Sequence, residues 1–158
     1  HIFEEAKLYG QKGWVDLTTS SYPYYSDIEI KPSTAMGEFL KAGVPLEHIT
    51  MTSDGNGSLP QFNEKGELEK LETGAPKSLF DELRDAVMEE NIPLEKALMT
   101  VTANPAHILK LKGKGTIQPG QDADLVIVDE NMIPDMVMAR GKILMKEGKI
   151  LVKSTYSS

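Results

Sequence analysis

The segment Ser53-Asp54-Gly55-Asn56-Gly57-Ser58 holds the side chains of this sequence whose types and spacing are best suited to chemistry. It ends a β-branched, apolar stretch that begins at Ile49, so Asp54 is expected where a strand ends. The carboxyl end of a parallel strand faces the ligand-binding mouth of an α/β sheet or barrel. A carboxylate at that place can bind a metal ion, accept a proton from a nucleophilic water, and pass it to a leaving amine.

The residues after Asp54 fit the same interpretation. Gly55 and Gly57 let the backbone turn sharply and come close to a ligand. Ser58 can offer its hydroxyl group to a polar group of a substrate. Asp, Asn and Gly are also the usual residues of ordinary turns, so a plain turn is the alternative interpretation of this segment.

The remaining candidate side chains do not complete a metal site. A zinc site needs at least three protein ligands. The histidines form neither a His-x-His pair nor a His-Glu-x-x-His motif, and they are His1, His48 and His107. The acidic clusters Glu89-Glu90 and Glu67-Glu69-Glu72 are typical of solvated faces. Asp122 and Asp124 are expected to organise the turn before a strand. Three tyrosines, Tyr22, Tyr24 and Tyr25, are expected in a loop, where they either line a pocket mouth or pack on the surface.

Strands and helices alternate along the first part of the chain. Apolar spacing near 3.6 residues, together with glycine and proline stops, predicts helices. Three of these helices span residues 3–11, 33–42 and 77–90, and a fourth begins near residue 93. A fifth helix is predicted to have Asn104 as its N-cap and Pro105 as its first residue. Strands are predicted over 14–19 and 49–53. A hairpin turn is predicted over 63–67. After residue 113 only strands are predicted: a buried one over 125–128, another over 136–139, and 143–145 with 150–152 around a Glu147-Gly148 turn.

Composition restricts the classes of function. The chain has 158 residues and a net charge of −7, with 24 acidic against 17 basic residues. This balance argues against a nucleic-acid surface, which needs clustered positive charge. The absence of cysteine excludes disulfides and thiolate metal sites. No apolar run approaches the roughly 20 residues that span a bilayer. We therefore expect a cytoplasmic protein with no membrane partner. On composition alone, a small α/β domain and the end of a larger barrel are equally favoured.

Three stretches together resemble the amidohydrolase superfamily. They are Thr52-Ser53-Asp54-Gly55, the run from Thr100-Val101-Thr102-Ala103-Asn104-Pro105-Ala106 to Gly120-Gln121-Asp122-Ala123-Asp124-Leu125-Val126, and Val137-Met138-Ala139-Arg140-Gly141-Lys142. Within that superfamily, the segment from Ser53 to Ser58 resembles the signature of the isoaspartyl (β-aspartyl) dipeptidases. Trp14 to Ser20, Ala42-Gly43-Val44-Pro45 and Lys146-Glu147-Gly148-Lys149 match the same family.

This resemblance implies an α/β fold, namely the C-terminal portion of a metal-dependent (β/α)8 TIM barrel plus part of a small β-sandwich domain. Residues 1–112 would supply the last barrel strands and helices, and residues 113–158 the C-terminal sandwich strands. The chain would then be a C-terminal fragment. The resemblance implies two zinc ions in the parent, held by a His-x-His pair, a carboxylated lysine, two further histidines and Asp54. All of these ligands except Asp54 lie outside this chain.

The resemblance also implies the reaction. A hydroxide bridging the metal ions attacks the isopeptide carbonyl of a dipeptide substrate. Asp54 acts as metal ligand and proton carrier, and Ser58 binds the substrate. The fragment alone is expected to be inactive, and a homo-oligomer is expected. The alternatives are another amidohydrolase, such as an amino-sugar deacetylase or a cyclic-amide hydrolase, and a non-catalytic assembly module.

Overall fold

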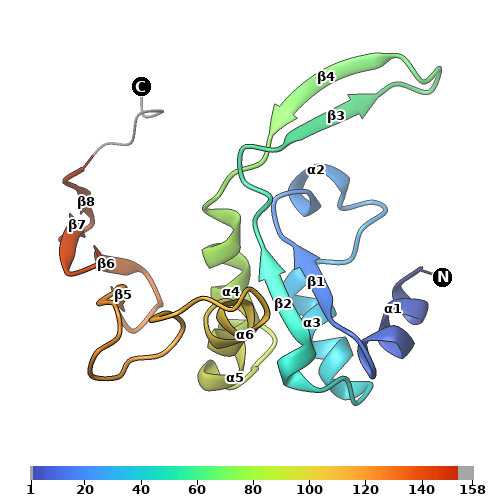
Figure 1. The fold of residues 1–158 in the computed structure, drawn as a ribbon. Coiled ribbons are helices and arrows are strands. Elements are labelled where there is room, and N and C mark those ends of the chain that lie inside the picture. The colour runs from blue at the N-terminus through green and yellow to red at the C-terminus, as the bar shows by residue number, and fades with distance from the viewer. Residues whose placement is uncertain (1, 153–158) are drawn as a thin grey trace. The chain divides into compact units, whose positions relative to one another are not determined.

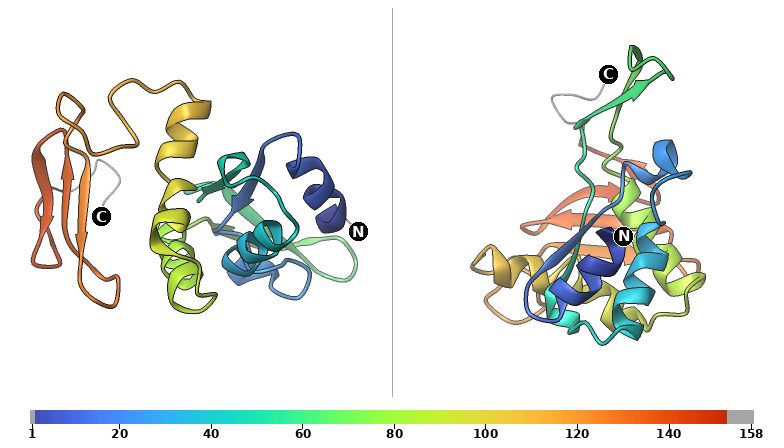
Figure 2. Two further views of the ribbon diagram at one scale, coloured as in Figure 1. Left: turned by 90° about the horizontal axis from the view of Figure 1, so that it is seen from below. Right: turned by 90° about the vertical axis from the view of Figure 1, so that its right-hand side faces the viewer.

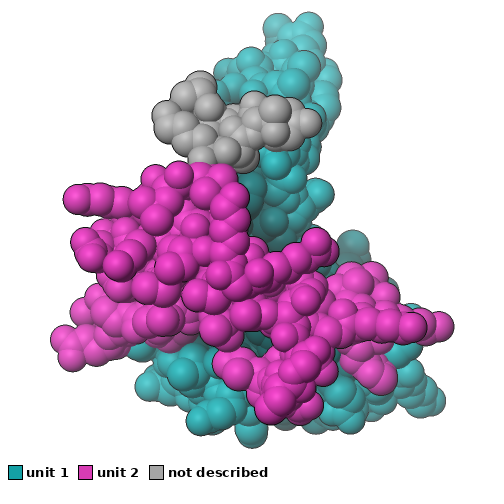
Figure 3. Space-filling model, turned by 60° about the vertical axis from the view of Figure 1, so that its left-hand side comes forward, with its two compact units in different colours: residues 1–105 teal, residues 106–158 magenta. Residues whose placement is uncertain are grey.

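A computed structural model describes residues 2–152 of the chain (Figure 1). The chain forms two compact units, His1–Pro105 and Ala106–Ser158, which Figure 3 colours separately. The predicted domain boundary after residue 112 concerns the family's domains and stays a prediction. His1, one of the candidate ligands considered above, lies outside the described residues.

Unit 1 is built on two parallel strands, β1 (Val15–Thr18) and β2 (Ile49–Thr52). Val15 lies opposite Ile49 and Thr18 opposite Thr52, so the two strands end at the same edge. Helices α1 (Ile2–Gly10) and α3 (Pro32–Lys41) pack on one face of this pair. The predicted parallel arrangement, on which the assignment of Asp54 depends, is confirmed.

The core of unit 1 lies between these strands and helices. Val15, Phe39, Val44 and Ile49 form a buried cluster, and the ring centroid of Phe3 lies 5.2 Å from that of Phe39. Strand alternation places Val15 and Ile49 on the helix-covered face, because successive side chains of a strand point to opposite faces. The other face therefore carries the polar positions of β1 and β2.

The rest of unit 1 connects and covers this centre. Its elements are α2 (Tyr22–Tyr25), a 3-10 turn η1 (Leu46–His48), the antiparallel hairpin β3 (Ser58–Phe62) and β4 (Leu68–Thr73), α4 (Ser78–Met88) and α5 (Leu94–Met99). The hairpin predicted around residues 63–67 is confirmed. The loop expected over residues 22–25 is wrong: these residues form one helical turn, because proline is tolerated in the first turn of a helix.

Asn104 was expected to cap a helix, and this is wrong. Helix α6 (Ala103–Ile108) begins before it. The Asn104 side chain instead donates hydrogen bonds of 2.8 Å to the backbone oxygens of Leu46 and Ile49. Asn104 is buried, and it fixes the start of β2 through these two carbonyl groups. Asn104 is thus a structural residue at the end of β2 opposite Asp54.

Helices α3 and α4 are joined by charged groups. The Lys31 ammonium lies 2.8 Å from a carboxylate oxygen of Asp85 and 2.7 Å from one of Glu89. Burial by itself would lower the pKa of Lys31, but the hydrogen bonds that Lys31 donates to Asp85 and Glu89 outweigh it and raise that pKa above its ordinary value. Burial by itself would raise the pKa of the Asp85 carboxyl group, but the hydrogen bond that Lys31 donates to it outweighs burial and lowers that pKa. Glu82, also buried, accepts the Ser33 N–H at 2.9 Å.

We predict that Lys31→Met lowers the free energy of unfolding by about 1 kcal/mol at neutral pH, a figure reduced for solvent screening. Because the pKa of Asp85 is lowered in the folded state, its contribution is present above the ordinary Asp pKa of about 3.9 and is lost as pH falls. Because the pKa of Lys31 is raised, its contribution is lost only at strongly alkaline pH. Urea unfolding at pH 7 and pH 3 measures the free energy of unfolding of both proteins. The difference between wild type and Lys31→Met should be smaller at pH 3 than at pH 7. Lys41→Met, which removes an exposed ion pair with Glu38, is the control, and it should lower the free energy of unfolding by less.

Unit 2 contains a four-stranded antiparallel sheet in the order β5-β6-β7-β8. Its strands are β5 (Leu125–Val128), β6 (Pro134–Ala139), β7 (Lys142–Lys146) and β8 (Lys149–Ile150). The Glu147-Gly148 turn is confirmed, with φ of 51° and 69°. The expected burial of β5 is wrong for this chain, because Val126 and Ile127 are about half exposed, at 51% and 52%.

Asp122 and Asp124 organise the entry to β5, as predicted. Lys114 forms ion pairs with both carboxylates, and Asp124 accepts the backbone N–H of Arg140 at 2.8 Å. Hydrogen bonds from Lys114 and Arg140 lower the pKa of Asp124. Among residues 2–152, no helix has the length and apolar character needed to cross a membrane.

Candidate functional site

The candidate site lies at the edge of unit 1 toward which β1 and β2 both point (Figure 1). Three segments meet there: Thr19 and Ser20 after β1, the Asp54 turn after β2, and the residues from Gly74 onward after β4. The Thr19 N–H donates to the Thr52 oxygen at 2.8 Å, which extends the ladder of the two strands toward this edge. Asp54 follows the end of β2, where the sequence predicted it, and its side chain is exposed.

The Asp54 turn is held by backbone hydrogen bonds. The Gly57 N–H donates to the Asp54 oxygen at 3.0 Å, and the Asn56 N–H donates to the Gly74 oxygen at 2.8 Å. Asp54 and Asn56 have positive φ, 46° and 65°, a region that Asp and Asn enter more readily than most residues. The segment is therefore a turn, and the two interpretations of the sequence are compatible: the turn presents the carboxylate.

Close packing fixes where this turn sits. A Cβ atom at Gly74 would lie 2.5 Å from the Ser20 hydroxyl oxygen and 2.8 Å from the Asp54 backbone oxygen. A Cβ atom at Gly57 would lie 3.1 Å from the carboxyl carbon of Asp54. Ser20 is buried, and its hydroxyl has no hydrogen-bond partner among the described residues. Both glycines are needed for the close approach that sets the position of the Asp54 backbone.

A second carboxylate, Asp16, lies on the polar face of the strand pair. It accepts a 2.6 Å hydrogen bond from each of the Thr50 and Thr52 hydroxyls. Asp16, Thr50 and Thr52 share the face that α1 and α3 leave uncovered, because they alternate with Val15, Ile49 and Met51. Asp16 was not among the residues predicted for the site. The signal was present as strict apolar–polar alternation in Val15-Asp16-Leu17-Thr18 and Ile49-Thr50-Met51-Thr52.

Ser58, the predicted substrate-binding residue, is the first residue of β3 and is exposed. It thus stands at the base of the hairpin, near in sequence to the Asp54 turn and on the same edge of unit 1. The tyrosines belong to α2, where Tyr25 donates a 2.5 Å hydrogen bond to the Pro60 oxygen. Tyr25 therefore supports the hairpin.

The histidines take structural or exposed positions in the described part of the chain. The Nδ1 atom of His48 lies 2.8 Å from the Gly10 oxygen, at the end of β2 opposite Asp54. His107 is exposed in the last turn of α6. Within residues 2–152 there is no group of three His, Cys, Asp or Glu side chains that could hold a metal ion. Asp54 can serve as one oxygen ligand of a metal ion, and a zinc site needs at least two more protein ligands.

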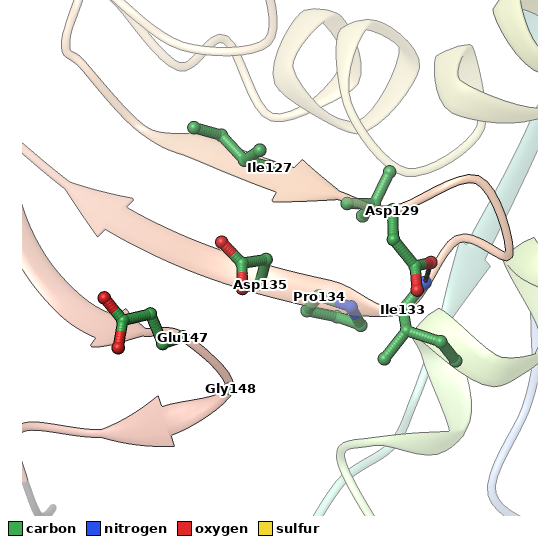
Figure 4. Close-up of a pocket in the computed structure, with 8 residues that line it drawn as sticks. Ile127, Asp129, Ile133, Pro134, Asp135, Glu147 and Gly148 are labelled. Atoms are coloured by element: carbon green, nitrogen blue, oxygen red, sulfur yellow. Dashed lines mark hydrogen bonds between the residues drawn. The ribbon is translucent and has the colours of Figure 1, made fainter.

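Unit 2 contains an open hollow of about 440 Å³ at one end of its sheet (Figure 4). Asp129, Asp135 and Glu147 line it. Asp129 accepts the N–H groups of Asn131 and Ile133 at 2.9 and 2.7 Å, so it organises the turn before β6. Nothing in this hollow resembles the arrangement around Asp54.

Solved structures similar to this chain include β-aspartyl dipeptidase from Fervidobacterium islandicum AW-1, in complex with β-Asp-Leu. It is 33% identical with a TM-score of 0.81, over 98% of this chain and 40% of that one. N-acetylglucosamine-6-phosphate deacetylase from Thermotoga maritima shares the fold, with 16% identity and a TM-score of 0.65 over 89% of this chain and 41% of that one. The chain therefore spans well under half the length of these proteins.

Curated relatives carry other names. Imidazolonepropionase of Picrophilus torridus is 31% identical over 70% of this chain and 29% of its own length. Dihydroorotase of Carboxydothermus hydrogenoformans is 42% identical over 41% of this chain and 14% of its own length. The model of the amidohydrolase family matches residues 12–144. This chain therefore belongs to the amidohydrolase family, a family of hydrolases built on a TIM-barrel type of fold.

Proposed function

We propose that the whole protein is a zinc-dependent dipeptidase that hydrolyses isoaspartyl (β-aspartyl) dipeptides, and that this chain supplies its last two barrel strands. The observation that carries the proposal is the exposed Asp54 carboxylate at the shared end of two parallel strands. The similarity to β-aspartyl dipeptidase, at 33% identity over 98% of the chain, supports the choice of substrate. Strands β5–β8 would belong to the β-sandwich domain of that protein.

In this proposal Asp54 moves a proton. Its carboxylate accepts a proton from the attacking water and delivers it to the amino group that leaves when the isopeptide bond breaks. Zinc ions, held mainly by residues outside this chain, would lower the pKa of that water and polarise the carbonyl. Ser58, four residues further on, would hydrogen-bond the dipeptide. The turn that fixes the Asp54 backbone keeps the carboxylate in place for both proton transfers.

A substrate panel on the whole protein tests the proposal. We expect hydrolysis of β-Asp-Leu, and none of α-Asp-Leu, of a cyclic amide or of an N-acetylated amino sugar. This 158-residue chain, whose described residues form no group that could hold a metal ion, should hydrolyse none of them and bind no stoichiometric zinc. Metal-dependent turnover by this chain alone, or activity of the whole protein on the α-linked peptide only, would contradict the proposal.

A cyclic-amide hydrolase is the second candidate. The observation that favours it is the 42% identity to dihydroorotase over 65 residues. That match covers 41% of this chain, whereas the dipeptidase match covers nearly all of it. Turnover of a cyclic amide in the same panel, with β-Asp-Leu left intact, would establish this second candidate instead.

A further inference from the structure

The β3–β4 hairpin has an uncovered apolar side. It projects from the rest of unit 1 (Figures 1 and 2). Pro60 lies opposite Leu71 and Phe62 opposite Leu68, so these four side chains share one side of the ribbon. Phe62, Leu68 and Leu71 are each about 60% exposed, at 60%, 58% and 59%. An isolated two-stranded hairpin is marginally stable, and further strands beside it would stabilise it.

The two outer edges of this hairpin differ. At the base of the hairpin the Gly74 N–H donates to the Gly57 oxygen at 2.9 Å, and this single bond sets the alternation of the ladder. Alternation along an antiparallel ladder makes Pro60 and Leu71 a non-hydrogen-bonded pair, whose backbone groups point outward. On the β3 edge, Pro60 has no N–H and its oxygen is taken by the Tyr25 hydroxyl. On the β4 edge, Leu71 presents both an N–H and a C=O group.

The charges of β4 are complementary to a second β4 in one register. When two copies pair antiparallel with Leu71 opposite Leu71, the outward backbone groups of both leucines form a hydrogen-bonded pair. Within each copy, Lys70 already forms an ion pair with Glu72 of the same strand. In this register Lys70 of each copy also lies opposite Glu72 of the other copy, and opposite charges at such positions are stabilising. A register centred on Lys70 would place the two lysines opposite each other, which is destabilising.

We propose that the open edge of β4 pairs with β4 of a second copy of this protein, in the register centred on Leu71. The result is a four-stranded sheet with the apolar sides of both hairpins joined. Directly opposed residues point to the same face, so the two Leu71 side chains meet there. This inference concerns association alone and does not depend on the proposed catalytic function.

Sedimentation velocity of the purified protein tests the interface. Glu72→Lys replaces both attractive pairs with Lys–Lys pairs and should weaken the dimer by about tenfold or more. The double variant Lys70→Glu/Glu72→Lys exchanges the charges, keeps the complementarity, and should restore the dimer. Leu71→Pro removes the outward N–H without removing a hydrogen bond inside the hairpin, and should also give monomers.

Glu64→Lys is the matched control, because it makes the same charge change at the hairpin turn, outside the paired region. It should leave the dimer intact. A wild-type protein that stays monomeric overturns the proposal, as does a double variant that dissociates as far as Glu72→Lys does. An equal loss of dimer in Glu64→Lys would show that net charge, and not this register, governs association.

Discussion

Under the proposed function, Asp54→Asn in the whole protein should lower kcat/KM for an isoaspartyl dipeptide by about 10²–10⁴-fold, the usual contribution of a positioned proton carrier. The amide keeps the size of the carboxylate and cannot accept the proton. Because Asp54 is exposed and its turn is held by backbone hydrogen bonds, the fold should be retained. Steady-state kinetics with β-Asp-Leu measure the effect, and thermal unfolding checks the fold.

Asp135→Asn is the matched control. It makes the same chemical change at an exposed carboxylate of unit 2, and activity should be unchanged. Metal analysis of both variants adds a second measurement: Asp54→Asn should bind zinc more weakly, whereas Asp135→Asn should not. Full activity in Asp54→Asn would remove this residue from the reaction and leave the segment as a plain turn.

Local patterns were enough to predict much of unit 1. The β-branched segments gave β1 and β2, and glycine after Ala42 and near Gln11 marked the helix ends. The position of Asp54 at a strand end followed from the same reasoning. These features depend on residues close together in the sequence, which is why periodicity and stop signals find them.

Features that depend on distant residues were not predicted. Asn104 resembles an N-cap locally, but its side chain satisfies the carbonyl groups of Leu46 and Ile49, more than fifty positions away. Glu82 lies in a helix like any solvated acid, yet it is buried because Ser33 offers it a backbone N–H. Tertiary partners decide both cases, and local propensity does not reveal them.

The apolar character of β5 exposes a different difficulty. Leu125-Val126-Ile127-Val128 is typical of a strand buried on both faces. In this chain β5 pairs with β6 and remains largely exposed. The apolar pattern indicates the environment that suits these residues, which is a strand covered on both faces. Within the described part of unit 2, no element covers the exposed side of β5. A sequence pattern therefore predicts burial only when the covering element is also present.

Gly74→Ala should impair the site from outside it. The new methyl group would sit 2.5 Å from the Ser20 oxygen and 2.8 Å from the Asp54 backbone oxygen, so one of these groups must move. Such overpacking costs about 1–3 kcal/mol of folding free energy. If the Asp54 turn shifts by about 1 Å, turnover should fall by about 10²-fold. Thermal unfolding and steady-state kinetics on the whole enzyme measure the two effects separately.

Two further variants separate crowding from a general effect of alanine. Gly37→Ala lies in α3, where the nearest atom is 3.7 Å from the added Cβ, so it should be neutral or slightly stabilising. Ser20→Ala combined with Gly74→Ala removes the 2.5 Å contact but keeps the contact with the Asp54 oxygen. The double variant should regain part of the stability, while activity stays low because the Asp54 backbone is still displaced. Recovery of full activity would mean that Ser20, and not the turn, takes up the strain, and that the position of Asp54 does not depend on Gly74.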